Sequence, residues 1–586
     1  MEEIKKFAKY FLPYKWSLIA GIVFIFVSMM FGLLIPSFVG NAIDDYRMAI
    51  HNGTLTYSRI AFHALLILAA NTVSGIFLFW QRRLLINTSR HIEYDMRQDF
   101  YASIVNQPLQ FFYDNRVGDL MARATNDLSA IRQIVGPLIL YSFQAIFAFV
   151  VVLPILAYMN LKLTLILLLT MPLVSVAVKV LGAKVHSRFE KVQEYFSNIT
   201  AIAQENLSGV RVVRAYAQEK PEIEKFQKLN REYAKLNLQL VKFQAAMRPV
   251  MFFLIGIGFV LIMFFGVPMA VRGEISAGNF AAFNLYLQRM IWYLIALGYV
   301  VNLWQRGTAS LKRFDAILET IPTIKDAENV SEQKPIHGKI EFRNLSFQYK
   351  PELPKVLQNI DLTIEQGKTV AFVGKTGSGK STLISLIPRL LETPNDTVFV
   401  DDVSVKNFPL AQLRKAIGVV PQETFLFSDT ISENIAFGVE NAKDMSVEKA
   451  AKIANLHEDI EGFPYKYEQL VGERGISLSG GQKQRTAIAR AVMRQPKILI
   501  LDDSLSAVDT YTEEHILANL REIREGRTTL IVSHRVSTVR DADLICVLNN
   551  GQIIERGTHE ELLKLNGEYA DLHRRQLLEE ELAATN

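Results

Sequence analysis

Hydrophobic positions are spread unevenly along the chain and crowd into its first half. Six apolar runs there are each close to the ~20 residues that cross a hydrocarbon layer as a helix. A soluble protein with buried core helices is the alternative, but so many runs of ~18 or more apolar residues disfavour it. The runs predict membrane-spanning helices at residues 17–39, 60–80, 135–158, 163–180, 250–271 and 281–301.

Basic residues beside these runs predict the orientation of the membrane domain. The segments 81–134 and 181–249 are rich in arginine and lysine, whereas segment 40–59 holds two aspartates and only Arg47 and Arg59. Cytoplasmic loops carry the excess of basic residues. We therefore expect both long segments, both termini and the second half of the chain to be cytoplasmic, in a multi-pass protein of the plasma or inner membrane.

The two long segments have a helical pattern and extend well beyond the spans. We expect each to carry two spans past the bilayer and to turn over at a tip, at residues 107–121 and 209–220. Residues 1–15 predict an amphipathic helix that leads into the membrane rather than a removed signal. Residues 16–313 then form the membrane domain.

Polar side chains inside the sixth span are candidates for a substrate cavity. Asn284 and Gln288 lie four residues apart and share one helix face, and Arg289 follows them. A polar residue within a span is costly unless it faces protein or water. These residues either line a wet central cavity or make hydrogen bonds that hold the bundle together, and an unpaired Arg289 would require an acid, water or an anionic ligand.

Composition bears on the class of partner, on the cysteine chemistry and on the domain boundaries. The formal net charge of +5 is small for 586 residues and argues against a nucleic-acid partner. Cys546 is the only cysteine, so an intrachain disulfide is impossible, and its apolar neighbours predict a buried small side chain. Polar and charged residues at 314–336 predict a linker, followed by an α/β domain at 337–575 and a tail at 576–586.

The α/β domain contains a phosphate-loop pattern between a buried strand and a helix. Residues 369–373 form an apolar run, and residues 382–391 have a helical pattern. The glycines let backbone N–H groups surround phosphates, Lys380 supplies charge to the outer phosphates, and Ser381 supplies an oxygen to Mg²⁺. The expected ATP-binding residues are Gly374, Lys375, Thr376, Gly377, Ser378, Gly379, Lys380, Ser381 and Thr382.

A second group of motifs lies between residues 478 and 509. Leu478-Ser479-Gly480-Gly481-Gln482 is followed by the apolar run 498–501, which ends in Asp502 and Asp503. Together with the phosphate loop, these motifs resemble the signature and Walker sequences of an ATP-binding cassette (ABC) exporter, and the resemblance covers nearly the whole chain. It implies a half-transporter with six membrane helices fused to a phosphate-loop ATPase domain.

The resemblance assigns roles to several residues. It implies that Tyr349 stacks on adenine, that Gln422 contacts Mg²⁺ and the attacking water, that Asp502 holds Mg²⁺, and that His534 is the switch histidine. It also implies that the tips of the long segments are coupling helices, and that segment 471–475 lies beside a coupling helix of the partner. Ser479, Gly480, Gly481 and Gln482 would contact the ATP of a partner subunit.

One position departs from the family pattern. Asp503 stands where the family usually has a glutamate that orients the attacking water. Its carboxylate is about 1.5 Å further back, and a misplacement of ~1 Å can cost ~10²-fold in rate. The expectation is a slow ATP site in a heterodimeric exporter of amphipathic drugs or lipids, with a non-identical partner that carries the glutamate. A homodimeric lipid flippase and an ATP-gated regulatory or channel protein are the alternatives.

Overall fold

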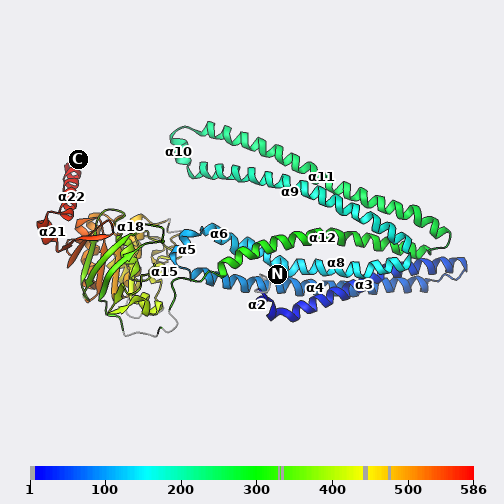
Figure 1. Ribbon diagram of the computed structural model, residues 1–586, viewed down its shortest axis with the longest axis horizontal. Coiled ribbons are helices and arrows are strands. Elements are labelled where there is room, and N and C mark those ends of the chain that lie inside the picture. Colours follow the sequence, from blue (N-terminus) through cyan, green and yellow to red (C-terminus); the bar gives the residue numbers. More distant parts are fainter. Residues whose placement is uncertain are drawn as a thin grey trace. The chain divides into compact units, whose positions relative to one another are not determined.

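The computed structural model describes residues 7–326, 330, 335–439, 446–472, 475, 477–524 and 526–585. The chain divides into two compact units (Figure 1). The first contains Met1–Ile104 and Gly118–Glu319, and the second contains Val105–Val117 and Thr320–Asn586. Each unit is described by itself below.

The first unit is built from long helices. Its principal members are α3 (Lys15–His51), α4 (Tyr57–Val105), α8 (Ile139–Met159), α9 (Leu161–Ser208), α11 (Glu219–Val271) and α12 (Ala277–Leu318). At about 1.5 Å per residue, the 49 residues of α4 span about 74 Å, more than twice the thickness of a hydrocarbon layer. A helix of this length therefore extends well beyond a bilayer, as the sequence predicts for the long segments.

Short elements connect the long helices. They are α2 (Ala8–Phe11), η1 (Leu12–Tyr14), α6 (Val117–Ala122), α7 (Leu128–Gln133), α10 (Val210–Ala215), and the π-helical turns η2 (Arg123–Asp127) and η3 (Ile134–Leu138). Asn160 separates α8 from α9, and its side chain accepts a hydrogen bond of 3.0 Å from the N–H of Leu163, which caps α9.

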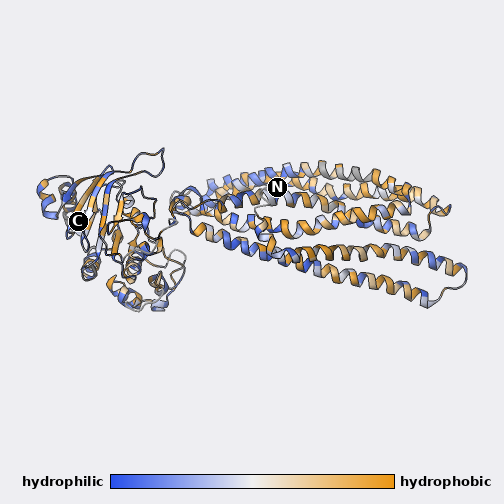
Figure 2. Cartoon of the chain, turned by 60° about the horizontal axis from the view of Figure 1, so that its bottom comes forward, coloured by the Kyte–Doolittle hydropathy of each residue, from blue (hydrophilic) through white to orange (hydrophobic). Residues whose placement is uncertain are grey.

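Five helical stretches of the described residues are long and apolar enough to cross a membrane. They are Ala8–His51, Tyr57–Val105, Val117–Met159, Glu219–Val271 and Ala277–Leu318. The fourth predicted span, 163–180, lies within α9, but several of its side chains are outside the described residues. Figure 2 shows hydrophobic residues concentrated along part of the length of these helices.

The second unit contains two sheets. A four-stranded sheet has the order β2-β1-β4-β5, and a six-stranded sheet has the order β10-β9-β3-β8-β7-β6. The strands are β1 (Ile340–Phe347), β2 (Leu357–Ile364), β3 (Thr369–Val373), β4 (Val398–Val400), β5 (Val403–Ser404), β6 (Ile417–Val420), β7 (Ile498–Asp502), β8 (Thr528–Val532), β9 (Leu544–Asn549) and β10 (Gln552–Gly557).

The core of the large sheet is parallel and buried on both faces. β3 pairs in parallel with β8 and β9, and β7 pairs in parallel with β6 and β8. Ala371 and Val373 pack into one hydrophobic cluster, whereas Val370 and Phe372 pack into another. Alternate side chains of a strand point to opposite faces, so β3 reads as an unbroken apolar run. Cys546 in β9 is fully buried, which confirms the prediction for this residue.

Helices accompany both sheets in the second unit. They are α5 (Leu109–Asp114), α13 (Lys380–Leu386), α14 (Leu410–Lys415), α15 (Ile431–Ala436), α16 (Val447–Ile453), α17 (His457–Glu461), α18 (Gly480–Met493), α19 (Thr510–Arg524), α20 (Val536–Val539), α21 (His559–Leu565) and α22 (Glu568–Thr585), with the 3₁₀ turns η4 (Val405–Asn407) and η5 (Lys466–Glu468).

Three sequence-derived boundaries differ from the structure. α12 continues to Leu318, into the predicted linker, and α22 runs through the predicted boundary at residue 575. α13 ends at Leu386 rather than at residue 391. Pro388 explains the early end, because it has no backbone N–H to continue the helical hydrogen bonds.

Candidate nucleotide site

The phosphate loop joins β3 to α13 and uses glycine where other residues are excluded. Gly374, Gly377 and Gly379 have φ angles of 141°, 82° and 101°, which L side chains rarely adopt. A Cβ on Gly374 would lie 2.1 Å from the carbonyl oxygen of Leu548. A Cβ on Gly377 would meet no atom within 4 Å, so the loop is open there. The loop thus leaves room for a phosphate group beside the backbone and the N-terminus of α13.

Lys380 folds back over this loop. Its Nζ donates to the carbonyl oxygens of Gly374 at 2.8 Å and of Lys375 at 2.9 Å. Burial lowers the pKa of Lys380, and the nearby carboxylates of Asp502 and Asp503 oppose this effect. Lys380 is therefore a partly desolvated cation held at the loop, where it could bind an anionic phosphate.

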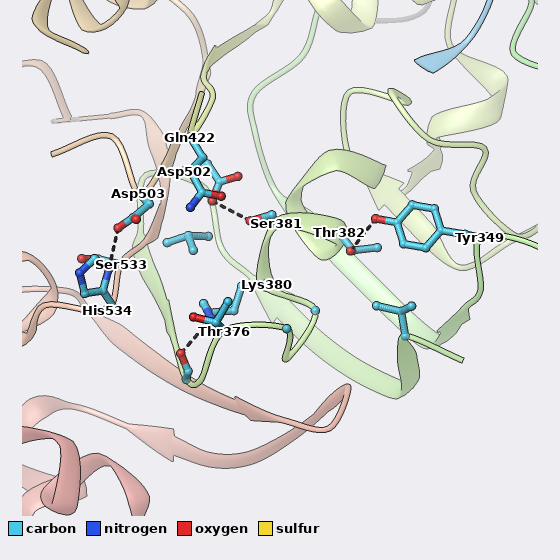
Figure 3. A pocket seen from close by; sticks show the side chains of 15 residues that line it. Tyr349, Thr376, Lys380, Ser381, Thr382, Gln422, Asp502, Asp503, Ser533 and His534 are labelled. Carbon is cyan, nitrogen blue, oxygen red and sulfur yellow. Dashed lines mark hydrogen bonds and ion pairs between the residues drawn. The ribbon is translucent and has the colours of Figure 1, made fainter. Parts of the chain in front are cut away.

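Ser381 and Asp502 form an oxygen pair suited to Mg²⁺. The Ser381 hydroxyl donates to Oδ1 of Asp502 at 3.0 Å, and Gln422 lines the same cavity (Figure 3). Burial raises the pKa of Asp502, because the ionised carboxylate has lost contact with water. A bound cation would replace that lost stabilisation. A hydroxyl, one carboxylate and an amide fit the oxygen preference of Mg²⁺, which is usually bound through one or two carboxylates plus substrate phosphates.

Tyr349 lies two residues beyond the end of β1. Its hydroxyl is 2.9 Å from Oγ1 of Thr382, and its ring meets that of Phe347 edge-on at 5.3 Å. The Tyr349 side chain remains 37% exposed, so one side of the ring is open to a planar ligand. Tyr349 and Thr382 thus mark one end of the cavity (Figure 3).

Asp503 and His534 meet at the other end of the cavity. Nδ1 of His534 lies 2.9 Å from Oδ1 of Asp503 (Figure 3). Asp503 has a φ of 44°, in the left-handed region, and follows directly after β7. The strained backbone at this residue turns its carboxylate toward the loop that follows β8.

Most of the predicted ATP residues line one cavity of about 360 Å³. Lys375 and Ser378 belong to the loop but do not line it, whereas Val356, Val532 and Ser533 line it and were not predicted. Val532 and Ser533 precede His534 directly, so their place could have been inferred from the motif. The lining residues are Tyr349, Val356, Gly374, Thr376, Gly377, Gly379, Lys380, Ser381, Thr382, Gln422, Asp502, Asp503, Val532, Ser533 and His534.

The segment Ser479–Gln482 is not among the described residues that line this cavity. It forms the N-terminal turn of α18 instead. Ser479 and Gln482 form a capping box, with hydrogen bonds of 3.2 Å from the Gln482 N–H to Oγ of Ser479 and 3.0 Å from the Ser479 N–H to Oε1 of Gln482. The side chain of Gln482 also donates to Asp459 at 2.9 Å. These bonds hold the glycine turn at the surface, away from the chain's own phosphate loop.

Comparison with known proteins agrees with this site. Residues 18–294 match the family described as ABC transporter transmembrane region, and residues 357–506 match the family described as ABC transporter. The chain is 36% identical over 576 residues to "Probable multidrug resistance ABC transporter ATP-binding/permease protein YheI" of Bacillus subtilis (strain 168), covering 98% of each chain. The chain belongs to the ABC transporter family.

Further relatives place this ABC transporter among exporters. It is 35% identical to "Multidrug resistance-like ATP-binding protein MdlA" of Escherichia coli (strain K12), covering 96% of this chain and 95% of the relative. It is 37% identical to "ATP-dependent lipid A-core flippase" of Syntrophus aciditrophicus (strain SB), covering 87% and 84%. A solved bacterial Atm1-family ABC exporter with ATP bound has a TM-score of 0.78 and 25% identity, covering 96% and 98%. The chain therefore has the ABC exporter fold and is an ATPase-coupled exporter in a membrane.

The segment 506–509 of this ABC exporter, which follows the paired carboxylates, is hydrogen-bonded to the signature helix α18. Gln484 of α18 donates to Oγ of Ser506 at 3.0 Å and accepts from the N–H of Ala507 at 3.0 Å. Gln484 was not predicted as a functional residue, and its position within the signature helix was the available signal. These two bonds join the signature helix directly to the segment 506–509.

The first of the two predicted coupling tips is the short helix α5. By its contacts α5 belongs to the ATPase unit of the exporter. Nζ of Lys350 lies 2.8 Å from Oδ1 of Asp114, at the end of α5, and Gln107 donates to the carbonyl of Thr320 at 2.8 Å. Lys350 directly follows Tyr349, so α5 is joined to the segment that borders the nucleotide cavity. The predicted segment 471–475 includes Glu473 and Arg474, which lie outside the described residues.

The candidate cavity residues of the sixth span have different surroundings. Asn284 is 9% exposed, and its Nδ2 donates to the carbonyl of Phe280 within its own helix at 2.8 Å. Gln288 is exposed and Arg289 is half-buried. The three side chains thus differ in burial, and their role in a substrate cavity stays a prediction.

Arg289 is paired with the backbone of another helix, so it is not the unpaired cation for which the sequence required an acid, water or an anionic ligand. Its guanidinium donates to the carbonyl of Gly32 in α3. In an uninterrupted helix this carbonyl would accept from the N–H of residue 36, but Pro36 has none. Tyr286 donates in the same way to the carbonyl of Leu33 at 2.6 Å. Arg289 therefore satisfies the α3 carbonyl that the proline leaves free, and Tyr286 adds a bond to the carbonyl that follows it.

Proposed function

We propose that this ABC exporter moves amphipathic small molecules, drugs or lipids, out of the cytoplasmic side of the membrane as one subunit of a heterodimer. The names of its relatives, multidrug resistance proteins and a lipid A-core flippase, support this cargo class. The basic residues beside the spans support cytoplasmic termini and a cytoplasmic ATPase domain.

Within this proposal the cavity at the phosphate loop binds ATP. Tyr349 stacks on the adenine, the loop N–H groups and Lys380 bind the phosphates, and Ser381, Gln422 and Asp502 hold Mg²⁺. Mg²⁺, when bound, neutralises charge on the outer phosphates. His534 lies at the end of the cavity opposite Tyr349 (Figure 3). From there it would contact the γ-phosphate.

One observation supports division of labour between two different subunits. The chain combines Asp503, a shortened carboxylate, with an intact and well-capped signature turn that does not line its own cavity. Its own site should hold Mg-ATP and cleave it slowly, because Asp503 places its oxygens further from the attacking water than glutamate would. The signature turn, Ser479 to Gln482, would complete a faster site on a partner that carries the glutamate.

Movement would pass between ATPase and membrane domains through the two tips. The contacts of α5 with the ATPase unit support this role for the first tip. The second tip, α10, buries none of its residues, and Val212 and Tyr216 are 62% and 74% exposed. Exposed apolar residues at a helical tip are suited to docking on a partner subunit.

A homodimeric lipid flippase is the second candidate, since one relative is named as a lipid A-core flippase. The two candidates differ in how single-site variants behave. In a heterodimer, Ser479→Arg should abolish most ATP hydrolysis, because it blocks the fast site, whereas Lys380→Ala should leave most of it. In a homodimer both substitutions affect both sites, so both should abolish hydrolysis.

The experiment uses the full-length chain, purified from its native membrane with whatever subunit accompanies it. Hydrolysis by the wild type, Ser479→Arg and Lys380→Ala assemblies is then measured at saturating ATP. A large loss for Ser479→Arg with retention for Lys380→Ala supports the heterodimer. Equal losses, together with a single polypeptide in the assembly, would show a homodimer.

A further inference from the structure

The C-terminal helix α22 is firmly attached to the ATPase unit at its start. The carboxylate of Glu555 in β10 accepts from the N–H of Glu568 at 2.6 Å and from that of Tyr569 at 3.2 Å, which caps the helix. Tyr569 is fully buried, and its hydroxyl lies 2.8 Å from Nδ1 of His559. The first turn of α22 is therefore fixed, and the side chains two turns later have a defined position.

Two turns further along, Gln576 makes two hydrogen bonds to the backbone of the loop that follows β8 and carries His534, called the switch loop below. Its Nε2 donates to the carbonyl of His534 at 2.5 Å, and its Oε1 accepts from the N–H of Val536 at 2.8 Å. The two bonds therefore hold the two peptide groups that flank Arg535, one through its carbonyl oxygen and the other through its N–H. One amide side chain thus sets the backbone conformation at His534.

Packing does little to hold the His534 side chain. It is 58% exposed, and its Nδ1 contacts Oδ1 of Asp503 at 2.9 Å. A cavity of about 420 Å³ adjoins it on the side of α22, lined by residues that include Lys375, Thr376, Leu572 and Arg575. Where the imidazole points therefore depends on its backbone.

Arg535 provides the other attachment of this loop. Its guanidinium donates to Oε2 of Glu513 at 2.8 Å and to the carbonyl of Val508 at 3.3 Å. Arg535 thus ties the loop to α19 and to the segment 506–509. Gln576 instead forms hydrogen bonds with the peptide groups of His534 and Val536 themselves. The two attachments use different residues. Removing the Gln576 side chain therefore breaks the bonds to His534 and Val536, while the bonds of Arg535 remain.

We propose that Gln576 is a positioning residue that aims His534 at the γ-phosphate, and that α22 is thereby part of the ATP site. The inference rests on the proposed contact between His534 and the γ-phosphate. It predicts that Gln576 affects ATP, which has this phosphate, and leaves ADP, which lacks it, unaffected. A residue that merely stabilised the domain would affect both nucleotides alike.

The test measures the release rates of ATP and ADP, each with Mg²⁺, from the full-length transporter in lipid nanodiscs. Gln576→Ala should speed ATP release by roughly fivefold, the effect of losing about one net hydrogen bond, and leave ADP release unchanged. Gln576→Met keeps the shape without the polar atoms and should do the same. Arg574→Ala, which removes exposed contacts with Asp571 of the same helix and with Asn566 just before it, should change neither rate.

A double-mutant cycle separates this inference from the proposed function. In a His534→Ala background, Gln576→Ala should have no further effect on ATP release. An equal effect in both backgrounds, an equal effect on ADP, or no effect in the wild type would overturn the inference. If His534→Ala itself leaves ATP release unchanged, the proposed contact of His534 with the γ-phosphate is the part that fails.

Discussion

His534 Nδ1 lies 2.9 Å from Asp503 Oδ1, so the shortened carboxylate and the histidine proposed to be the switch residue are direct partners. The two residues come from loops that follow the adjacent parallel strands β7 and β8. The carboxylate is thus engaged by the imidazole at the end of the cavity where the γ-phosphate is proposed to bind. A glutamate at this position would extend one methylene further. The contact between the shorter Asp503 and His534 is therefore a feature of the site that is proposed to be slow.

The ion pair between Asp114 and Lys350 should affect how strongly cargo stimulates ATP hydrolysis, and it should not affect folding. Both side chains are nearly half exposed, so Lys350→Ala should change cargo-stimulated hydrolysis by less than about fivefold and leave thermal stability unchanged. The exchange of charges, Asp114→Lys with Lys350→Asp, should restore most of the stimulation. Stimulated hydrolysis in proteoliposomes measures both effects, and a double exchange no better than Lys350→Ala would contradict a role for the pair.

The same pair predicts a pH range for coupling. The Lys350 ammonium lowers the pKa of Asp114, and the Asp114 carboxylate raises the pKa of Lys350. The contribution of Asp114 is lost only as the pH falls through its lowered folded-state pKa, and that of Lys350 only as the pH rises through its raised one. The ratio of wild-type to Lys350→Ala stimulation should therefore be constant from about pH 5 to pH 9. A ratio that changes near neutrality would show that another group titrates with the pair.

Asp502→Asn should stabilise the transporter in the absence of Mg²⁺ and nucleotide. Burial raises the pKa of Asp502 above its unfolded value, so the folded state binds more protons and its stability falls as the pH rises through the folded-state pKa. Above the folded-state pKa this cost is fully present, and the neutral amide removes it. The unfolding temperature should rise, by roughly 2–4 °C for each kcal/mol recovered in a domain of this size.

Mg-ATP supplies the control for this prediction. It should raise the unfolding temperature of the wild type much more than that of Asp502→Asn, because the variant lacks the carboxylate that would hold the cation. Equal stabilisation of both proteins by Mg-ATP would mean that Asp502 does not bind the metal.

Arg289 and Pro36 should show strong coupling in stability. Arg289→Met leaves the Gly32 carbonyl without its partner inside the membrane, at a cost of about 1–3 kcal/mol. Pro36→Ala returns an N–H to α3, so the carbonyl regains a helical partner and Arg289→Met should then cost much less. Thermal unfolding of the four proteins in the same detergent tests this cycle, and independent, additive effects would exclude the proposed pairing.

The sequence predicted the elements that depend on local pattern. β3 and β7 are continuous apolar runs because a parallel strand is buried on both faces, and the glycines of the phosphate loop follow from its backbone geometry. The roles of Arg289 and Gln576 could not be predicted, since their partners lie far away in the chain and no periodicity links them. Gln576 even fell in a segment that was predicted to be a tail.

The rate of ATP hydrolysis by the full-length chain alone, with and without Asp503→Glu, tests the central claim most directly. The chain reconstituted without any partner should hydrolyse ATP slowly, and Asp503→Glu should raise the rate by up to ~10²-fold because it returns the carboxylate to the attacking water. Lys380→Ala in the same background should remove the gain. Fast hydrolysis by the unaltered chain, with no gain from Asp503→Glu, would contradict the account.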